Sequence, residues 1–295
     1  MHLISYRPAD AVSRLGVVAG DQVMPAASLL PGGPRTIDEL LAWGEPGISA
    51  LRQAADADRI SREGQPLAGL RLVAPVPRPG KIVAIGRNYA DHVAEDDATP
   101  PVAPLILAKW PTSVIGPGDE IRWDGTLTSQ VDFEAELAVV IGRRARRVRE
   151  ADAFDFVLGY TCLNDVSARD LQFGDGQWVR GKSLDTFCPI GPQIVTRDEI
   201  PDPGNLAISC TVNGERVQAA RTSDMLFSVA QIISYASRSF TLEPGDVIAT
   251  GTPAGVGAFR RPPRFLNDGD VVTVTIERIG ALTNVCRVER STGGS

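Results

Sequence analysis

A short alternating segment of the chain carries carboxylates that a hydrophobic core does not explain. The stretch Asp-Phe-Glu-Ala-Glu-Leu places Asp132, Glu134 and Glu136 on one face of a strand, because successive strand side chains point to opposite sides. Neighbouring carboxylates repel one another unless a cation lies between them. Asp165, which follows a later apolar run, adds a further oxygen ligand. The pattern predicts a site for a hard divalent ion, Mg²⁺ or Mn²⁺ with Ca²⁺ open, rather than Zn²⁺, which prefers His and Cys.

A second pair has the spacing of a base and the acid that orients it. His92 and Glu95 are three residues apart, so one helical turn brings them to the same side. A carboxylate that accepts one ring N–H fixes the imidazole tautomer and raises its basicity, which leaves the other nitrogen to deprotonate water. A surface histidine near an acid by chance is the alternative.

The composition is that of a globular protein with many turns. The chain has 295 residues, enough for one large domain or for a principal domain with a smaller annex. Apolar residues make up 43% and charged residues 22%, which argues against a disordered or fibrous class. The 29 glycines and 22 prolines favour a turn-rich, mostly β architecture.

The net charge and the length of the apolar stretches indicate which partners and which cellular location to expect. The formal net charge of −6 argues against a nucleic-acid partner, although five arginines between Arg143 and Arg149 form a basic run, interpreted as the solvated end of a hairpin. No apolar stretch approaches the roughly 20 residues of a membrane span, and the first residues lack a signal-peptide core. We therefore expect a cytoplasmic protein with no membrane contact. The cysteines form no Cys-x-x-Cys pair and are expected to be buried, reduced thiols.

The elements that must position these side chains fall into two parts. Residues 1–75 are expected to form a small N-terminal α/β annex, with strands near 3–6 and 16–18 and helices near 36–43 and 48–57. A stretch with three prolines follows, and residues 76–80 are assigned as a linker. Residues 81–290 form the main domain, and residues 291–295 a disordered tail.

Strands outnumber helices in the main domain. They are expected at residues 81–86, 105–108, 134–141, 156–163, 192–195, 207–212, 246–250 and 271–276. Val-Asn-Gly-Glu at 212–215 is a hairpin signal, and one helix is expected from about Ser223 to Ser237, capped by Thr222-Ser-Asp. The Pro- and acid-rich run 96–104 is expected to be a mobile lid.

Five ordered blocks of sequence require a common explanation. They are Gly-Arg-Asn-Tyr-Ala-Asp-His (86–92), Asp-Phe-Glu-Ala-Glu-Leu-Ala-Val-Val-Ile-Gly (132–142), Asn-Asp-Val-Ser-Ala-Arg-Asp-Leu-Gln (164–172), Gly-Lys-Ser-Leu-Asp-Thr-Phe-Cys-Pro (181–189) and Thr-Gly-Thr-Pro-Ala-Gly-Val-Gly (250–257). In this order they resemble the fumarylacetoacetate hydrolase (FAH) family over roughly residues 80–289. The resemblance implies an α+β, mainly β fold with a mixed β-roll domain, in a homodimer with one divalent metal per active site, Mg²⁺ first among the candidates.

The resemblance also assigns the central residues of a site. It places the metal ligands on Glu134, Glu136 and Asp165, which strand periodicity had selected independently. Asp132 is expected to hydrogen-bond beside the ligands rather than to bind the metal. The catalytic His-Glu dyad of the family falls on His92 and Glu95.

Four further residues take roles from the same resemblance. Lys182 would stabilise developing negative charge, and its segment lacks the spacing of a nucleotide-binding loop. Gln172 and Thr252 match positions that hydrogen-bond the substrate's carboxylate and keto oxygens. Arg87 is a candidate for a distal carboxylate, with a structural ion pair as the alternative. A phosphate cradle around Thr252 is disfavoured, because no Lys or Ser/Thr lies in register with its glycines.

The predicted activity is metal-dependent hydrolysis of a C–C bond in a small keto acid. The substrate class is an acylpyruvate or other 2,4-diketo acid, fumarylpyruvate or a 2,4-diketo-3-deoxy sugar acid included, and the products are pyruvate and a carboxylic acid. An oxaloacetate decarboxylase, or an isomerase or tautomerase of 2-hydroxy-diene-dioates, would use the same metal and enolate chemistry without attack by water. A non-catalytic metal- or dicarboxylate-binding module is a further alternative. The presence of both His92 and Glu95 favours hydrolysis.

Overall fold

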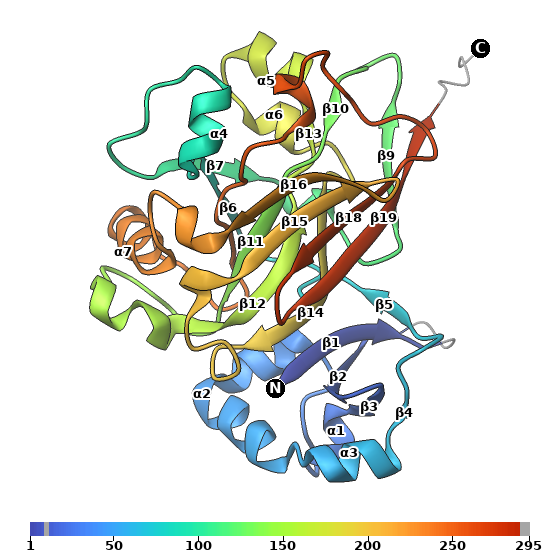
Figure 1. Cartoon of the computed structure of the whole chain (residues 1–295). Helices are drawn as coiled ribbons and strands as arrows, with labels where there is room; N and C mark the ends of the chain where they lie inside the picture. The colour runs from blue at the N-terminus through green and yellow to red at the C-terminus, as the bar shows by residue number, and fades with distance from the viewer. Residues whose placement is uncertain (9–11, 290–295) are drawn as a thin grey trace, which may run out of the picture.

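A mixed twelve-stranded sheet runs through the molecule from the N-terminal part to the site (Figure 1). This computed structural model describes residues 1–8 and 12–289. The strands, in spatial order, are β4 (Gln65–Pro66), β3 (Gln22–Pro25), β2 (Arg14–Ala19), β1 (His2–Arg7), β14 (Cys188–Thr196), β12 (Val157–Asn164), β11 (Ala135–Ile141), β17 (Val247–Ala249), β6 (Ile82–Gly86) and β7 (Leu105–Lys109), with β5 (Arg71–Val73) on β1 and β8 (Val114–Ile115) on β14.

The N-terminal residues share this sheet with the rest of the chain. β1 pairs antiparallel with β14 through His2 opposite Val195. Three helices cover this end of the molecule, drawn in blue at the bottom of Figure 1: α1 (Ala26–Leu29), α2 (Ile37–Ala54) and α3 (Ala57–Glu63). The two helices predicted near 36–43 and 48–57 are both present within α2, where a kink at Gly44 separates them; the φ of 63° at Gly44 lies in the left-handed region and its backbone is not helical. The domain division at residues 75–81 stays a prediction.

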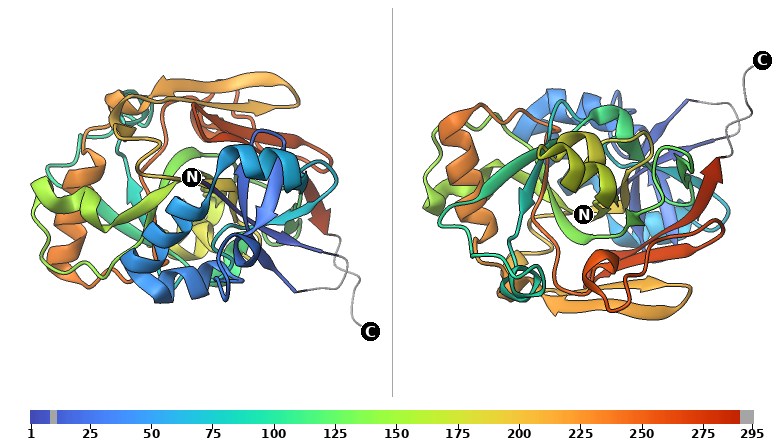
Figure 2. Two further views of the ribbon diagram at one scale, coloured as in Figure 1. Left: turned by 90° about the horizontal axis from the view of Figure 1, so that it is seen from below. Right: turned by 90° about the horizontal axis from the view of Figure 1, so that it is seen from above.

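A second sheet lies against the first as a separate layer. It contains β16 (Glu215–Arg221), β15 (Ala207–Val212), β18 (Val271–Ile276), β19 (Gly280–Glu289) and β9 (Glu120–Asp124). Figure 2 shows its orange and red strands beside the green strands of the first sheet. The predicted hairpin at 212–215 is confirmed, because Asn213 and Gly214 both have positive φ, as a two-residue turn between β15 and β16 requires. A short pair, β10 (Val131–Asp132) with β13 (Ser167–Ala168), lies near the site.

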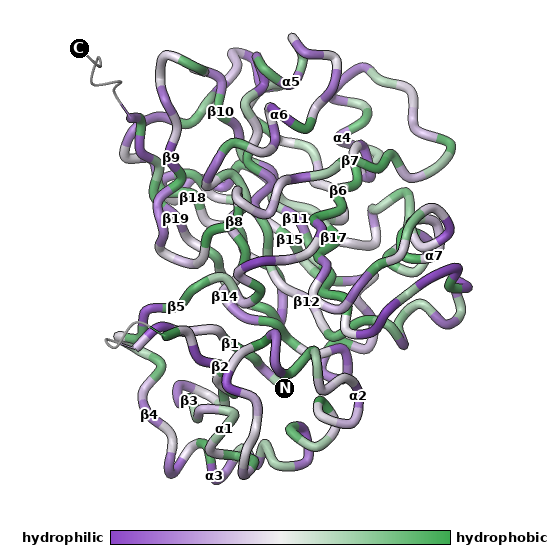
Figure 3. The backbone as a smooth tube through the Cα atoms, turned by 180° about the vertical axis from the view of Figure 1, so that it is seen from behind, coloured by the Kyte–Doolittle hydropathy of each residue, from purple (hydrophilic) through white to green (hydrophobic). Residues whose placement is uncertain are grey.

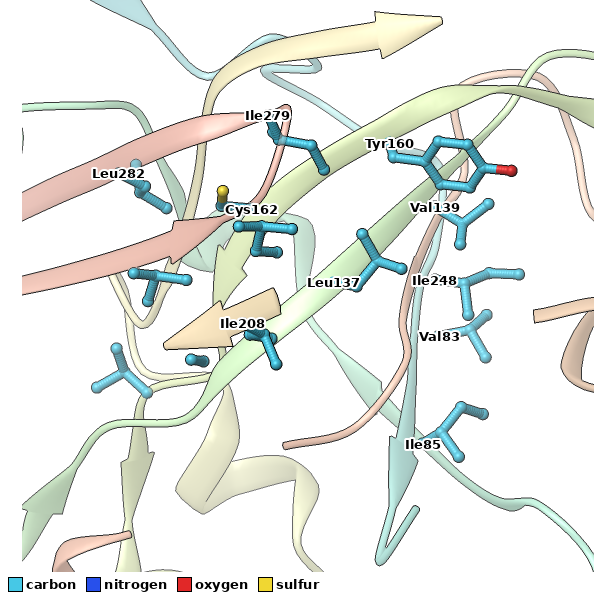
Figure 4. Close-up of a cluster of buried hydrophobic side chains, with 14 of the residues drawn as sticks. Val83, Ile85, Leu137, Val139, Tyr160, Cys162, Ile208, Ile248, Ile279 and Leu282 are labelled. Atoms are coloured by element: carbon cyan, nitrogen blue, oxygen red, sulfur yellow. The ribbon is translucent and has the colours of Figure 1, made fainter. Parts of the chain in front are cut away.

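The core forms on both faces of β11, whose seven residues are all buried. Leu137, Val139 and Ile141 belong to the cluster between the two sheets, part of which is drawn in Figure 4. Ala138 and Val140 face the other way and join the cluster that includes the apolar side of α2. Figure 3 shows β11, β17 and β6 as mainly hydrophobic strands in the middle of the molecule. The strand predicted at 134–141 is therefore confirmed, and beyond Glu136 it is apolar on both faces.

The remaining regular elements are helices, most of them short. They are α4 (Ala90–Glu95), α5 (Arg169–Asp175), α6 (Val179–Lys182), α7 (Val229–Ser239), and the 3-10 turns η1 (Pro111–Ser113), η2 (Glu150–Phe156), η3 (Pro203–Asn205), η4 (Thr222–Asp224) and η5 (Gly257–Phe259). The prediction that the long helix begins near Ser223 is wrong. Residues 222–224 form η4, and α7 begins only after Ser228, which makes a capping box with Gln231.

The fold is mixed α and β with strands predominating, as predicted. All four cysteines, Cys162, Cys188, Cys210 and Cys286, are buried free thiols, as expected. The basic run 143–149 lies in the connection after β11, and its arginines are exposed. Among the described residues no helix is long and apolar enough to cross a bilayer. The predicted tail at 291–295 and the end of the main domain at 290 lie outside the described residues.

Candidate active site

Three carboxylates converge where β11 begins. Glu134 directly precedes this strand, Glu136 is its second residue, and Asp165 follows the last residue of β12. One carboxylate oxygen from each lies within 4.8 Å of the others, and all three side chains are buried. Asp132, on β10, lies outside this cluster. The spacing of the acids in the sequence therefore identified a group that the fold brings together.

The antiparallel register explains why acids so far apart in the sequence meet. Ala135 pairs with Asn164, so the start of β11 lies beside the end of β12. The Asp165 amide donates to the Glu134 carbonyl at 2.9 Å. The Glu134 amide donates to Asn164 Oδ1 at 3.0 Å. These two bonds fix the backbone on both sides of the cluster.

Lys182 neutralises part of the carboxylate charge. Its Nζ lies 2.9 Å from Glu134 Oε2 and 2.8 Å from Asp165 Oδ2, and it donates to Ser167 Oγ at 2.9 Å. An ammonium has three donors, so all of them are used within the protein. Burial alone would lower the pKa of Lys182, but the charges of Asp165 and Glu134 outweigh burial and raise the pKa. The predicted role in stabilising substrate charge stays a prediction, and it would act through charge rather than through a free N–H.

Lys109, the last residue of β7, is a second buried lysine that sequence reasoning missed. Its Nζ donates to Asp165 Oδ1 at 2.6 Å, to the Val166 carbonyl at 3.3 Å and to the Lys182 carbonyl. The segment Leu-Ile-Leu-Ala-Lys reads as an ordinary strand that ends in an exposed lysine. Nothing local distinguishes it, because its partners come from other elements.

Arg169 opens α5 and was also missed. Its Nε donates to Asp132 Oδ2 at 2.8 Å, and its Nη1 lies 2.7 Å from Glu134 Oε1 and 3.0 Å from Gln172 Oε1. Its Nη2 is buried without a hydrogen-bond partner among the described residues. An unsatisfied buried donor costs about 1–3 kcal/mol, so this nitrogen is available for a ligand oxygen. The sequence feature that could have identified Arg169 as a site residue is its position four residues after Asp165, inside the block 164–172.

Glu136 differs from the other two acids. Among the residues that the structure describes, no lysine or arginine lies within ion-pair distance of its carboxylate, which accepts the Gly251 amide at 2.7 Å. Burial, together with the negative charges of Asp165 and Glu134, raises the pKa of Glu136 well above its ordinary value. For Glu134, the charges of Lys182 and Arg169 outweigh burial and hold the pKa at about 2.

This donor set fits a divalent metal ion. The cluster offers carboxylate oxygens only, as hard cations prefer, and one of its acids lacks a cation from the protein. A cation at this point would relieve the repulsion from Asp165 and Glu134 that adds to burial in raising the pKa of Glu136. The site can therefore hold a divalent ion, and its chemistry favours Mg²⁺, Mn²⁺ or Ca²⁺ over Zn²⁺.

The predicted dyad is formed on α4. His92 Nδ1 and Glu95 Oε1 are 2.8 Å apart, and His92 is buried with its ring centroid 5.9 Å from that of Phe259. The Gly255 amide donates to the second oxygen, Glu95 Oε2, at 2.9 Å. With Nδ1–H donating to Glu95, a neutral imidazole keeps its lone pair on Nε2.

The loop 250–258 holds several site carboxylates through its backbone amides. Gly251 donates to Glu136, Gly255 to Glu95, and the amides of Gly257 and Ala258 to Asp132 at 2.7 and 3.0 Å. At Gly255 φ is 106°, and a Cβ would lie 2.2 Å from the Val217 carbonyl, so a side chain cannot be accommodated. These amides bind the protein's own acids, which agrees with the rejection of a phosphate cradle.

Arg87 lies in an ion pair near the cavity mouth. Its Nε and Nη2 lie 3.0 and 2.5 Å from Asp96 Oδ2, and its guanidinium stacks 5.7 Å from the Trp178 ring centroid. A φ of 54° turns the chain at Arg87 between β6 and α4. The ion-pair alternative is therefore present in the structure, and the role in binding a distal carboxylate stays a prediction.

These residues surround one cavity. It is lined by Ile85, Gly86, Arg87, His92, Asp96, Leu107, Glu134, Glu136, Asp165, Arg169, Gln172, Phe173, Trp178, Lys182, Thr252 and Phe259. Every predicted site residue lines it except Glu95, which contacts it through His92. Phe173 and Phe259 form an aromatic pair at its wall, with ring centroids 6.4 Å apart.

Comparison with known proteins decides the family. The family model described as fumarylacetoacetate (FAA) hydrolase C-terminal matches residues 81–287. The chain belongs to this family. It is 43% identical over 291 residues to the protein named oxaloacetate tautomerase fahd2, mitochondrial, of Xenopus laevis, with 96% of this chain and 89% of that protein covered.

A bacterial relative and a solved structure give the same result. The chain is 43% identical over 259 residues to oxaloacetate tautomerase YisK of Bacillus subtilis, covering 85% of this chain and 86% of that protein. The crystallised fumarylacetoacetate hydrolase from Exiguobacterium antarcticum is similar in fold, with a TM-score of 0.85 at 39% identity over 98% of this chain and all of that one. Family membership supports enzyme status, and the named relatives agree better with the tautomerase alternative than with hydrolysis.

Proposed function

We propose that this protein is a metal-dependent keto–enol tautomerase for a 2-oxo dicarboxylate of the oxaloacetate class. The observation that carries the proposal is the dyad of His92 and Glu95 facing a carboxylate cluster, in a chain more than 40% identical to two proteins named oxaloacetate tautomerase. Tautomerisation requires one proton to move between carbon 3 and the 2-oxo oxygen. A single histidine with an open ring nitrogen can perform that transfer.

The charge of the site suits an anionic substrate. Asp132, Glu134, Glu136 and Asp165 face three buried cations, Lys109, Lys182 and Arg169, which leaves one negative charge. A divalent ion makes the same group positive by one charge. A dicarboxylate would then enter a site of opposite sign.

Glu134, Glu136 and Asp165 would hold the ion, which we propose to be Mg²⁺. When bound, it supplies Lewis acidity that polarises a 2-oxo group and acidifies the C–H bond beside it. Arg169 Nη2 donates to a substrate oxygen that carries developing charge, because this nitrogen has no protein partner. Lys182 adds positive charge close to the same oxygens.

His92 moves the proton. Glu95 holds Nδ1–H, so Nε2 accepts the proton from carbon 3 and returns it at the 2-oxo oxygen. Gln172 and Thr252 bind the oxygens of the carboxylate next to the keto group. Arg87 binds the second carboxylate, in exchange for Asp96.

The test follows the enol form of oxaloacetate directly. Enol oxaloacetate is mixed with the protein and Mg²⁺, and its ultraviolet absorbance and the release of pyruvate are recorded together. We expect faster loss of the enol, no pyruvate beyond the uncatalysed amount, and loss of the effect with EDTA or with His92→Ala. Enol decay that equals the protein-free rate would overturn the proposal.

Hydrolysis is the second candidate, because the geometry of His92 and Glu95 also suits activation of a water molecule. Acetylpyruvate distinguishes it, since only hydrolysis yields pyruvate from that compound. Pyruvate released from oxaloacetate, and retained in His92→Ala, would instead indicate decarboxylation. A binding module would change none of these signals.

The assembly is proposed to be a homodimer, by analogy with the family. Measurement of mass in solution tests it, and a monomer that retains full activity would contradict any role for a second copy.

A further inference from the structure

Gln218 bridges the carboxylate strand and the loop after β17. It is the central residue of β16 and is 2% exposed. Its Oε1 accepts the Ala135 amide at 2.9 Å. Its Nε2 donates to Thr252 Oγ1 and to the Pro253 carbonyl, both at 2.8 Å. None of these contacts follows from a sequence motif, because three separate segments meet at one side chain.

The orientation of this amide is fixed by its backbone partners. The Ala135 N–H can only donate, so the atom that faces it must be the oxygen. The Pro253 carbonyl can only accept, so the atom that faces it must be the nitrogen. An exchange of the two atoms would place oxygen against oxygen and N–H against N–H. The second hydrogen of Nε2 is therefore directed at Thr252 Oγ1.

This arrangement determines what the Thr252 hydroxyl can do. Because its oxygen accepts from Gln218, its own hydrogen must be donated elsewhere. Within the part of the chain that the structure describes, no protein acceptor takes that hydrogen. Thr252 lines the cavity and is 3% exposed. The hydroxyl hydrogen is left for an acceptor inside the cavity.

The other end of the bridge reaches the backbone between two proposed metal ligands. Ala135 separates Glu134 from Glu136, so its amide belongs to the backbone that carries both carboxylates. A bond from Gln218 to this amide sets the distance between the cluster and Thr252. One buried side chain thus connects the group that binds a cation to a donor for an anion.

We propose that Gln218 is a positioning residue that aims the Thr252 O–H at the substrate carboxylate and keeps it in register with Glu134 and Glu136. The identity of the acceptor as a 2-oxo acid carboxylate rests on the proposed function. The bridge itself rests only on the contacts of Gln218. Supporting groups of this kind typically change metal affinity or activity about 10–100-fold when removed.

The experiment is a double-mutant cycle on ligand affinity. Wild type, Gln218→Met, Thr252→Val and the double variant are loaded with Mg²⁺, and the affinity for oxalate is measured by calorimetry. Oxalate has two adjacent carboxylates, so it resembles the carboxylate and 2-oxo group of the substrate. It cannot tautomerise, so the measured affinity does not depend on turnover. Asn284→Leu serves as the matched control: Asn284 is equally buried and donates to the carbonyls of Gly116 and Asp119 at 2.9 and 2.8 Å, with no contact to the site.

We expect each single variant at Gln218 and Thr252 to weaken oxalate binding about tenfold, and the double variant to lose less than about twofold more, because Gln218 acts through Thr252. Asn284→Leu should lose thermal stability similar to Gln218→Met but retain oxalate affinity. In turnover of the enol, Gln218→Met should raise KM more than it lowers kcat. Additive losses in the cycle, or an unchanged affinity in Gln218→Met, would overturn the proposal.

Gln218→Glu covers the case in which Gln218→Met does not fold. Glutamate keeps the length of the side chain and the acceptor for the Ala135 amide, but an ionised carboxylate has no hydrogen for Thr252. Thr252 would then donate to position 218, and oxalate affinity should fall in a folded protein. An unchanged affinity in this variant contradicts the proposal, as does a wild type that binds no oxalate. If the cycle behaves as expected but the enol is not turned over, the proposed function fails and the role of Gln218 stands.

Discussion

Strand β11 has two ends with equal burial and opposite chemistry. From Leu137 to Ile141 every side chain is aliphatic and packs into the core on one face or the other. At the other end, Glu134 and Glu136 are 5% and 1% exposed and carry carboxylates into the interior. Burial of aliphatic surface stabilises a fold, whereas burial of a carboxylate destabilises it unless nearby cations and hydrogen bonds compensate. One end therefore supplies stability, whereas the other carries the carboxylates of the proposed metal site at a cost in stability.

The charged end is compensated by contacts from several distant elements. Lys109 comes from β7, Lys182 from α6 and Arg169 from α5, so three separate segments must be in place before the acids are neutralised. The apolar end needs no such specific partners. Substitutions at the two ends should therefore differ in how they divide their effects between stability and ligand binding.

The largest effect is expected from Lys182→Met. Loss of Nζ leaves Glu134 and Asp165 without a shared cation, and breaking a buried ion pair from one side costs about 3–5 kcal/mol. We expect this loss in urea unfolding without metal, together with loss of enzyme activity. Arg144→Met is the control, because the Arg144–Glu243 pair is exposed and such pairs contribute only about 0–1 kcal/mol. Equal losses in the two variants would show that the buried network does not differ from a surface pair.

Ile141→Ala tests the apolar end. This side chain is fully buried in the cluster between the sheets, and removal of such a side chain costs about 2–5 kcal/mol. Activity per folded molecule, measured well below the unfolding temperature, should be unchanged because Ile141 is at the end of β11 away from the carboxylates. A fall in kcat at full folding would mean that the two ends are coupled.

The sequence identified the carboxylate cluster because strand periodicity is local. Glu134 and Glu136 share a face through their spacing of two, and Asp165 stands out as an acid directly after a buried strand. Lys109 and Gln218 were not identified, because each belongs to an unremarkable segment and acquires its partners only through tertiary packing. Arg169 lies inside the block 164–172, but its contacts with Asp132 and Glu134 also form only in the folded chain.

The same distinction applies to the fold. Strands with alternate residues buried, such as 207–212 and 271–276, were predicted at their observed bounds, since their hydrophobic pattern is a property of the strand itself. The start of α7 was misplaced because two polar segments, at Thr222 and at Ser228, both resemble caps. The second is the real one, and Met225 between them instead pairs with Tyr89, a long-range contact that no local pattern reveals.

Glu136→Gln should change how stability depends on pH. The raised pKa of Glu136 means that the folded, metal-free protein still binds a proton at pH values above 4.5, the ordinary pKa of this carboxyl, where the unfolded chain has released it. This stabilising contribution is present below that value and is lost as pH rises through the folded pKa. We expect the unfolding temperature of wild type in EDTA to fall as the pH rises above about 4.5, and the fall to be smaller in Glu136→Gln.

Mg²⁺ provides the control for this titration. Saturation with the ion stabilises ionised Glu136 and should remove the fall with pH in wild type, with an added stability of about 2.7 kcal/mol at a hundredfold excess over Kd. Glu134, whose pKa is about 2, affects stability in the opposite direction: its stabilising contribution is lost as the pH falls below the ordinary value of 4.5. Identical pH profiles for wild type and Glu136→Gln in EDTA would contradict a raised pKa for Glu136.

The smallest effect is expected at the partly exposed mouth of the charged region. Asp96 forms an ion pair with the Arg87 guanidinium, the group that would bind a second substrate carboxylate. The pair is too exposed to contribute more than about 1 kcal/mol to stability. Asp96→Asn should therefore leave the unfolding temperature nearly unchanged while lowering KM for oxaloacetate about two- to fivefold, because the substrate no longer displaces an internal carboxylate. Inhibition by pyruvate, which lacks the second carboxylate, should not change. Asp97→Asn removes the same charge from the neighbouring exposed residue, and an equal fall in KM there would mean that net charge rather than release of Arg87 is responsible.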